Sequence, residues 1–178
     1  KAKVIKIVRE TSDCVRISFD VPDEHKTKFQ FKAGQYLNLK IDLNNEEIRR
    51  SYSICSSPFE NELSVAVKKI PLGKFSSHAI STMKENDVIE LMPPMGNFIL
   101  PDDLDEIKTF IFYCAGSGIT PVISLIKTIL NFHSDKNVIL YYGNRHTDSI
   151  IFREELEDLK NIFTTRFSLN YILTKERL

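Results

Sequence analysis

A glycine-rich loop lies between two apolar segments in the second half of the sequence. Gly116, Ser117 and Gly118 follow an unbroken apolar run, and Pro121 stands at the start of a segment with helical spacing. Glycines at such a junction let backbone N–H groups approach a diphosphate, whose negative charge the helix dipole favours. Pro121 replaces the third glycine of the usual dinucleotide fingerprint, so a plain tight turn is the alternative.

A second candidate site is the cluster Arg50-Ser51-Tyr52-Ser53. In an alternating strand Arg50 and Tyr52 share one face, whereas Ser51 and Ser53 take the other. Arginine suits a bidentate grip on phosphate, tyrosine suits stacking on a flat ring, and serine supplies a single hydrogen bond. An exposed strand with a surface arginine pair at positions 49 and 50 is the alternative.

A third cluster, at residues 68–77, combines lysines with a Pro/Gly loop that leads into a helix. Ser76 or Ser77 would cap that helix, and the same N-terminus would receive a second phosphate group. A plain N-cap flanked by solvated lysines is the alternative.

Short strands separated by Pro, Gly and Asn fill the first hundred residues. In the segment 35–43 the apolar residues fall at every second position, which predicts a half-buried strand. Six such strands predict an antiparallel barrel or sandwich, interrupted by one helix at about residues 76–83. The strands are expected at residues 4–8, 14–19, 35–43, 50–56, 63–67 and 88–92.

After residue 101 strands alternate with helices, which predicts a parallel sheet. The apolar run 108–115 lacks alternation, as expected for a strand buried on both faces. We therefore expect two domains, residues 1–103 and 104–178. The second has three strands where five or six are usual, so we expect it to be incomplete at its C-terminus. Its helices are expected at 122–132 and 150–160, and its other strands at 137–142 and 167–173.

The composition excludes several function classes. The 178 residues carry 24 Lys+Arg and 24 Asp+Glu, and this zero net charge argues against nucleic-acid and membrane-surface binding. Three widely spaced cysteines cannot form a four-Cys site and the four histidines lack ligand spacing, so no metal site is predicted. Without a bilayer-length apolar run or a signal-peptide core, the sequence predicts a cytoplasmic protein.

Five motifs in order resemble the ferredoxin–NADP⁺ reductase superfamily, and within it the oxygenase-reductase branch, over nearly the whole chain. They are Arg50-x-Tyr52-Ser53-x-x-Ser56, Gly73-x-x-Ser76, Pro94-x-Gly96-x-Phe98, Gly116-Ser-Gly-Ile-Thr-Pro121 and Tyr142-Gly-Asn-Arg145. The resemblance implies a six-stranded antiparallel Greek-key FAD-binding barrel followed by a parallel α/β NAD(P)-binding domain.

The resemblance also implies roles for individual residues. Arg50 would hold the FAD diphosphate, Tyr52 would stack on the flavin, and Ser53 would hydrogen-bond near flavin N5. Ser53 and Thr120 are the residues expected to tune the encounter of flavin and nicotinamide. Further FAD contacts are expected from Ala66, Val67, Lys68, Gly73, Phe75, Ser76 and Ser77, and nucleotide contacts from Gly116, Ser117, Gly118, Thr120, Asn144, Arg145, Thr174 and Lys175.

The segment Thr174-Lys175-Glu176 lies where relatives that prefer NADP⁺ carry Ser-Arg-Glu for the adenosine 2′-phosphate. Lysine neutralises such a phosphate but lacks the guanidinium fork, and a solvated lysine at a strand end is the alternative. NADPH is therefore expected over NADH.

The resemblance implies a reductase that passes electrons from NAD(P)H through FAD to an iron–sulfur or haem partner. The partner would be a separate protein or a fused [2Fe–2S] ferredoxin domain, whose four-Cys spacing this chain lacks. A stand-alone flavin reductase and a non-catalytic FAD-binding electron-transfer subunit are the alternatives. The family's later Cys-Gly segment has no counterpart before Leu178, so FAD binding is expected of this fragment, and hydride transfer is expected of the full-length protein.

Overall fold

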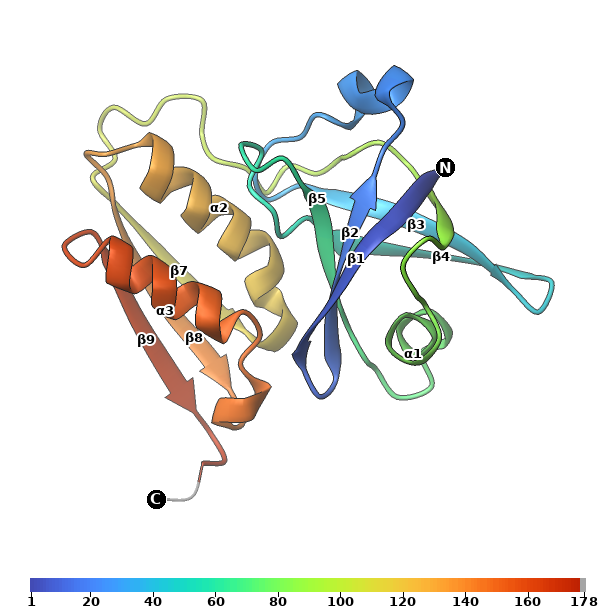
Figure 1. Cartoon of the computed structure of the whole chain (residues 1–178). Coiled ribbons are helices and arrows are strands. Elements are labelled where there is room, and N and C mark those ends of the chain that lie inside the picture. The colour runs from blue at the N-terminus through green and yellow to red at the C-terminus, as the bar shows by residue number, and fades with distance from the viewer. Residues whose placement is uncertain (177–178) are drawn as a thin grey trace.

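Two β-sheets, one antiparallel and one parallel, make up the computed structural model, which describes residues 1–176 (Figure 1). The antiparallel sheet has six strands in the order β4-β3-β6-β1-β2-β5. Its strands are β1 (Ala2–Thr11), β2 (Cys14–Asp20), β3 (Tyr36–Leu43), β4 (Glu46–Ser53), β5 (Leu63–Lys68) and β6 (Val88–Leu91). A 3₁₀ helix, η1 (Asp23–Phe29), follows β2, and helix α1 (Lys74–Ser81) follows β5.

The antiparallel sheet curls into a barrel, because a bridge between Ile54 and Val65 joins the end of β4 to β5. Alternate side chains of each strand point inward, so that Val4, Ile17 and Leu37 lie fully buried in the barrel core with Ile54 and Val65. The predicted barrel of six antiparallel strands is confirmed.

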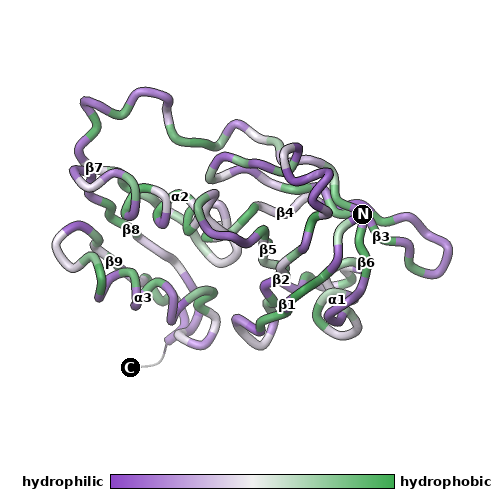
Figure 2. The backbone as a smooth tube through the Cα atoms, turned by 45° about the horizontal axis from the view of Figure 1, so that its top comes forward, coloured by the Kyte–Doolittle hydropathy of each residue, from purple (hydrophilic) through white to green (hydrophobic). Residues whose placement is uncertain are grey.

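The β3–β4 hairpin turns through Asn44 and Asn45, whose φ angles are 53° and 63°. A two-residue hairpin turn needs this left-handed pair, which asparagine tolerates better than most residues with a side chain. Figure 2 shows that the hairpin tip is hydrophilic and extends away from the rest of the chain. The turn fixes the register of β4 and places Tyr52 opposite Leu37.

The second unit is a parallel sheet in the order β7-β8-β9 with two helices. It comprises β7 (Thr109–Ala115), a 3₁₀ turn η2 (Gly116–Gly118), α2 (Ile119–Phe132), β8 (Asn137–Asn144), a 3₁₀ turn η3 (Thr147–Ser149), α3 (Arg153–Ile162) and β9 (Phe167–Leu173). Figure 1 shows α2 and α3 side by side over one face of this sheet. The predicted α/β unit after the barrel is confirmed.

Strand β7 corrects one expectation, because it is buried on one face instead of two. Phe110, Phe112 and Cys114 pack into the core beneath the helices, whereas Ile111 and Tyr113 are 53% and 74% exposed. Within residues 1–176 both helices of this unit cover the same face of the sheet, which leaves alternate residues of β7 in solvent.

Two helices begin at residues other than those predicted. Helix α1 starts at Lys74, two residues early, because Gly73 is its N-cap residue. Helix α3 starts at Arg153, three residues late, because Phe152 adopts a left-handed conformation with φ of 59°. The three residues before the helix, 150–152, are all buried in the core.

Strand β5 is buried on both faces, although it lies at one end of the order of strands. Leu63, Val65 and Val67 point into the barrel core. Ala66, on the opposite face, packs with α2 in the core of the second unit. The same strand therefore joins the two units.

The segment between β6 and β7, residues 92–108, contains the predicted domain boundary between residues 103 and 104, which stays a prediction.

No helix within residues 1–176 has the length and apolar character that a membrane crossing requires.

The thiol of Cys55 lies where β5 joins the two units, in the same core cluster as Ala66. It is buried, and its Sγ lies 3.3 Å from Ser64 Oγ. Burial raises the pKa of Cys55 to about 12, against a smaller opposing effect of the Ser64 hydrogen bond. The folded thiol therefore keeps its proton at a pH where an unfolded cysteine, with a pKa of about 8.5, has lost it.

We predict that the free energy of unfolding falls as the pH rises above about 8.5, by at most about 1.4 kcal/mol per pH unit for each such thiol. Urea unfolding of Cys55→Ala and of the parent protein, from about pH 7 to about pH 10, should give a shallower decline for the variant. Parallel declines would show that the Cys55 thiol does not contribute.

Candidate functional site

A pocket of about 370 Å³ opens where the barrel meets the second unit; we call it the Tyr52 pocket. It collects residues from β4, from the end of β5, from the start of α1 and from the loop before α2. Its lining is Arg50, Ser51, Tyr52, Ser53, Ala66, Lys68, Ile70, Gly73, Phe75, Ser76, Ser117 and Thr120. Ten of these twelve were predicted as site residues, and they come together from four separate segments of sequence.

Strand β4 supplies the cation and the aromatic ring of the pocket. Arg50 is exposed, donates from Nη1 to the Arg49 carbonyl at 2.6 Å, and forms no ion pair with any residue from 1 to 176. The half-buried Tyr52 ring lies 5.2 Å from the Phe75 ring, centroid to centroid, at an interplanar angle of 38°. Burial raises the pKa of Tyr52 to about 12, against a smaller lowering by the charge of Arg50. Ser53 follows directly and also lines the pocket.

The end of β5 contributes alternate side chains. Ala66 and Lys68 line the Tyr52 pocket, whereas the side chain of Val67 points into the barrel core. The period of two along a strand separates these neighbours. The structure therefore does not bring the Val67 side chain to the predicted site.

The start of α1 closes the pocket on a third side. The Ser76 hydroxyl accepts from the Ile70 N–H at 3.2 Å and donates to the Gly73 carbonyl at 3.3 Å. A Cβ at Gly73 would lie 2.5 Å from Ser76 Oγ, so this approach requires glycine. Neither Ser76 nor the predicted alternative Ser77 caps the helix, because Gly73 is the N-cap residue, and Ser77 does not line the pocket.

The glycine-rich loop forms the wall that belongs to the second unit. Gly116 to Gly118 form the η2 turn, which runs straight into α2. Thr120 Oγ1 donates to the Ser117 carbonyl at 2.8 Å, and both residues line the Tyr52 pocket. Gly118 lines neither this pocket nor the groove described next, since it faces Cys114.

A larger hollow of about 900 Å³ continues from the Tyr52 pocket; we call it the Arg145 groove. The two share Lys68 and Ser117. The groove lies at the carboxyl ends of β7 and β8, where open α/β sheets bind ligands. Its lining is Asp13, Lys68, Lys69, Pro71, Ala115, Gly116, Ser117, Gly143, Asn144, Arg145, His146, Ser149 and Thr174.

Most predicted nucleotide contacts lie in this groove. Gly116 has a φ of 50°, and no atom lies within 4 Å of the position of an added Cβ, so its backbone is open to the groove. Asn144 Nδ2 is buried without a hydrogen-bond partner among the described residues. The side chain of Lys175 does not line the groove, although its N–H donates to the Arg145 carbonyl at 2.9 Å.

The charge of both hollows favours anions. Arg50 and Lys68 are the charged residues of the Tyr52 pocket, and no carboxylate from residues 1–176 lines it. In the Arg145 groove, Lys68, Lys69 and Arg145 face one carboxylate, Asp13, whose Oδ2 lies 3.7 Å from Lys68 Nζ. No group of three His, Cys, Asp or Glu side chains within the described chain is placed to hold a metal ion.

The sequence did not identify every lining residue. Ile70 and Lys69 lie inside the 68–77 cluster, so the predicted site residues on either side of them could have identified them. Asp13 and Ser149 reach the groove from the β1–β2 turn and from the η3 turn, and no local pattern marks them.

Comparison with protein families agrees with this geometry. Residues 1–99 match the oxidoreductase FAD-binding domain, and residues 112–177 match the oxidoreductase NAD-binding domain. The chain therefore belongs to the ferredoxin–NADP⁺ reductase-like family of FAD- and NAD-binding oxidoreductases. The predicted resemblance is confirmed.

The similar curated proteins include reductase components of oxygenases. The chain is 39% identical over 175 residues to a subunit of the 1,2-phenylacetyl-CoA epoxidase of Escherichia coli (strain K12), covering 98% of this chain and 49% of that protein. It is also 39% identical over 168 residues to the ferredoxin reductase component of 3-ketosteroid-9-alpha-monooxygenase of Rhodococcus rhodochrous, covering 93% and 47%. The chain thus spans about half the length of these relatives.

Solved structures share the fold. A structure of ferredoxin-NADP⁺ reductase from Plasmodium falciparum with 2′P-AMP superimposes with a TM-score of 0.83 at 26% identity, over 98% of this chain and 73% of that one.

The residues of the Tyr52 pocket fit FAD. A guanidinium without a carboxylate partner and a helix end without a side-chain cap are donors for a diphosphate. The Tyr52 ring, held by Phe75, offers a flat face to an isoalloxazine. The open backbone at Gly116 and the cations of the Arg145 groove fit a pyridine nucleotide in the same way.

We predict that Arg50→Ala weakens FAD binding by about 10- to 100-fold, since a charge-assisted hydrogen bond contributes about 1.5–3 kcal/mol. Arg49→Ala is the matched control, because Arg49 pairs with Glu47 at 2.7 Å on the protein surface. Titration of the apoprotein with FAD, followed by flavin fluorescence, measures both. Equal affinities in the two variants would remove Arg50 from the diphosphate site.

Proposed function

We propose that the protein is an NAD(P)H-dependent flavoprotein reductase that supplies electrons to an iron–sulfur or haem partner of an oxygenase. The observation that carries this proposal is the shared lining of one pocket by two units. Ser53 comes from the FAD-binding barrel, and Ser117 and Thr120 come from the NAD-binding unit. Residues of the FAD-binding domain and of the NAD-binding domain therefore border the same pocket, in which flavin and nicotinamide would meet.

In this proposal the barrel holds the flavin. Arg50 and the start of α1 at Gly73 bind the diphosphate, and Tyr52 stacks on the ring system. Ser53 directs one hydrogen bond to the edge of the ring. The packing of Tyr52 against Phe75 keeps water from that side of the pocket.

The second unit orients the nucleotide. Thr120 is held by its hydrogen bond to the Ser117 carbonyl, so its side chain has a fixed position in the pocket that Ser53 also lines. FAD, when bound, supplies the chemistry that accepts two electrons from NAD(P)H and releases them singly. The protein contributes position and water exclusion, and no side chain acts as a general base.

The partner is inferred from the relatives. The similar proteins are named as a subunit of an epoxidase and as the ferredoxin reductase component of a monooxygenase. An iron–sulfur or haem centre, on a separate protein or in a fused ferredoxin domain, is the acceptor that agrees with those names.

We predict that the purified full-length protein is yellow with bound FAD and that NADPH or NADH bleaches it under anaerobic conditions. Stopped-flow absorbance of the flavin measures the reduction. A protein that takes up no FAD would overturn the proposal. A flavin that stays oxidised with both nucleotides would leave only the non-catalytic electron-transfer subunit, and a flavin lost on gel filtration would favour the stand-alone flavin reductase.

We propose NADPH as the preferred donor, because three cations border the Arg145 groove and the Plasmodium falciparum relative was solved with 2′P-AMP. Arg145→Ala should lower the ratio of NADPH to NADH affinity by at least about tenfold, as expected for the loss of one charged hydrogen bond of about 1.5–3 kcal/mol. Lys160→Ala, a change of an exposed lysine on α3, is the control. An unchanged ratio in Arg145→Ala would show that Arg145 does not bind the 2′-phosphate.

A further inference from the structure

Helix α2 carries a stripe of buried polar residues on an otherwise apolar segment. Thr120, Ser124, Lys127 and Thr128 are all buried, with exposures of 4%, 0%, 5% and 7%. Their spacing of three and four residues puts them on one face of the helix. The buried side chains around them are mainly Ile, Val and Leu. Thr120 and Thr128 donate to the carbonyls of Ser117 and Ser124 in the same segment, whereas the Ser124 hydroxyl and the Lys127 ammonium have their partners outside the helix.

The loop between β4 and β5 provides partners for Ser124, Lys127 and Thr128. Ser124 Oγ donates to the Ser56 carbonyl at 2.6 Å, and Thr128 Oγ1 lies 3.3 Å from Ser57 Oγ. This loop belongs to the barrel and begins directly after the strand that carries Arg50 and Ser53. The polar contacts therefore cross from one unit to the other.

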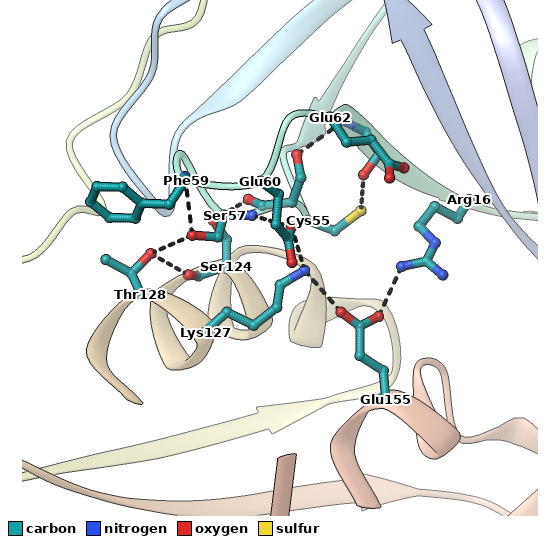
Figure 3. A network of polar contacts seen from close by, with 12 residues as sticks. Arg16, Cys55, Ser57, Phe59, Glu60, Glu62, Ser124, Lys127, Thr128 and Glu155 are labelled. Carbon is teal, nitrogen blue, oxygen red and sulfur yellow. Dashed lines mark hydrogen bonds and ion pairs between the residues drawn. The ribbon is translucent and has the colours of Figure 1, made fainter. Parts of the chain in front are cut away.

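Lys127 makes the charged part of this contact (Figure 3). Its Nζ lies 2.9 Å from Glu60 Oε2 in the barrel loop and 2.9 Å from Glu155 Oε1 on α3. Glu155 Oε2 accepts in turn from Arg16 Nη1 on β2 at 2.8 Å. Glu60 Oε2 also accepts from the Ser57 N–H at 2.7 Å. We call Arg16, Glu60, Lys127 and Glu155 the Lys127 network.

The Lys127 side chain is charged despite its burial. Burial lowers the pKa of Lys127, but Glu155 and Glu60 together raise it above its usual value. A buried ion pair of this kind adds little net stability compared with apolar packing, and its better attested role is to select one arrangement of the parts.

The arrangement that it selects includes the Tyr52 pocket. Lys127 lies two helical turns, or about 10 Å, from Thr120 along the same helix. Glu60 lies in the loop that continues from Ser53. A shift of α2 along this loop would move Thr120 relative to Ser53, and both residues line the Tyr52 pocket, one from each unit.

We propose that Lys127 is a positioning residue, which through Glu60 and Glu155 holds α2 in register with the barrel and so fixes the distance between the nucleotide side and the flavin side of the pocket. This inference rests on the proposed function for its effect on rate, and on the contacts of residues 56–60 for its effect on structure.

The test compares Lys127→Met with Lys136→Met in the intact protein. Lys136 is also buried, at 4% exposure, but its ion pair is with the adjacent Asp135 in the same unit. Methionine keeps the length of the side chain, and Glu60 and Glu155 retain 41% and 26% exposure, so water can solvate them after the change. Glu60→Gln is a second variant that removes the charge on the barrel side alone.

We expect Lys127→Met to bind FAD within about twofold of the parent and to slow flavin reduction at saturating NAD(P)H by at least about tenfold, since misplacement by ~1 Å can cost up to ~10²-fold in rate. Amide hydrogen exchange of residues 56–60 should accelerate while that of β1 and β2 stays unchanged. Lys136→Met should change neither measurement, and Glu60→Gln should change both in the same direction as Lys127→Met.

Two results would overturn the positioning role: a reduction rate in Lys127→Met equal to that of the parent, or unchanged exchange at residues 56–60. A parent protein that NADPH and NADH fail to reduce would instead overturn the proposed function, and the exchange measurement would then decide the structural role of Lys127 by itself.

Discussion

Strand β5 is the element on which both halves of the site depend, because each of its faces is buried in a different core. Its inward side chains fill the barrel, and Ala66 on its outer face packs under α2. The end of the strand then presents Lys68 to both the Tyr52 pocket and the Arg145 groove. Any change that separates β5 from α2 would open the pocket at the point where the two hollows join.

The contacts across this junction divide into two kinds. Small apolar side chains, including Cys14, Cys55 and Ala66, join the core cluster that contains the apolar residues of α2 and supply non-directional attraction. Hydrogen bonds and ion pairs at the Ser56–Glu60 loop are directional and must meet their partners at fixed positions. The apolar contacts hold the two units together, and the directional contacts determine the register of α2 against the barrel loop.

Much of the fold was predictable from local pattern. Alternation in residues 35–43 predicted β3, and the order of strands and helices predicted the two sheets. The Arg50–Ser53 and Gly116–Thr120 segments were identified because their residue types and spacing are those that bind phosphate groups and flat rings. The half-exposure of β7 was not predictable, since burial depends on which face the helices cover and not on the strand's own composition.

The Lys127 network also lay beyond sequence reasoning. Lys127 and Glu60 are 67 positions apart, and Glu155 and Arg16 are 139 apart, so no local spacing connects them. Taken alone, the run of acidic residues at the start of α3 has the pattern of a solvated helix face, yet Glu155 turns inward to a buried lysine. The zero net charge of the chain also hides how its charges are distributed. Carboxylates lie at the interface between the units, whereas the charged residues that line the Tyr52 pocket are all cations.

The choice of a lysine at this interface has a geometric consequence. An ammonium with two carboxylate partners at 2.9 Å loses both contacts if α2 slides by a fraction of a helical turn, whereas alanine and cysteine surfaces tolerate such a slide. A reductase must keep two bound ring systems in contact, so a sliding interface would misplace them without unfolding either unit. In the proposed role the buried charge therefore sets register at the interface together with the hydrogen bonds of the Ser56–Glu60 loop.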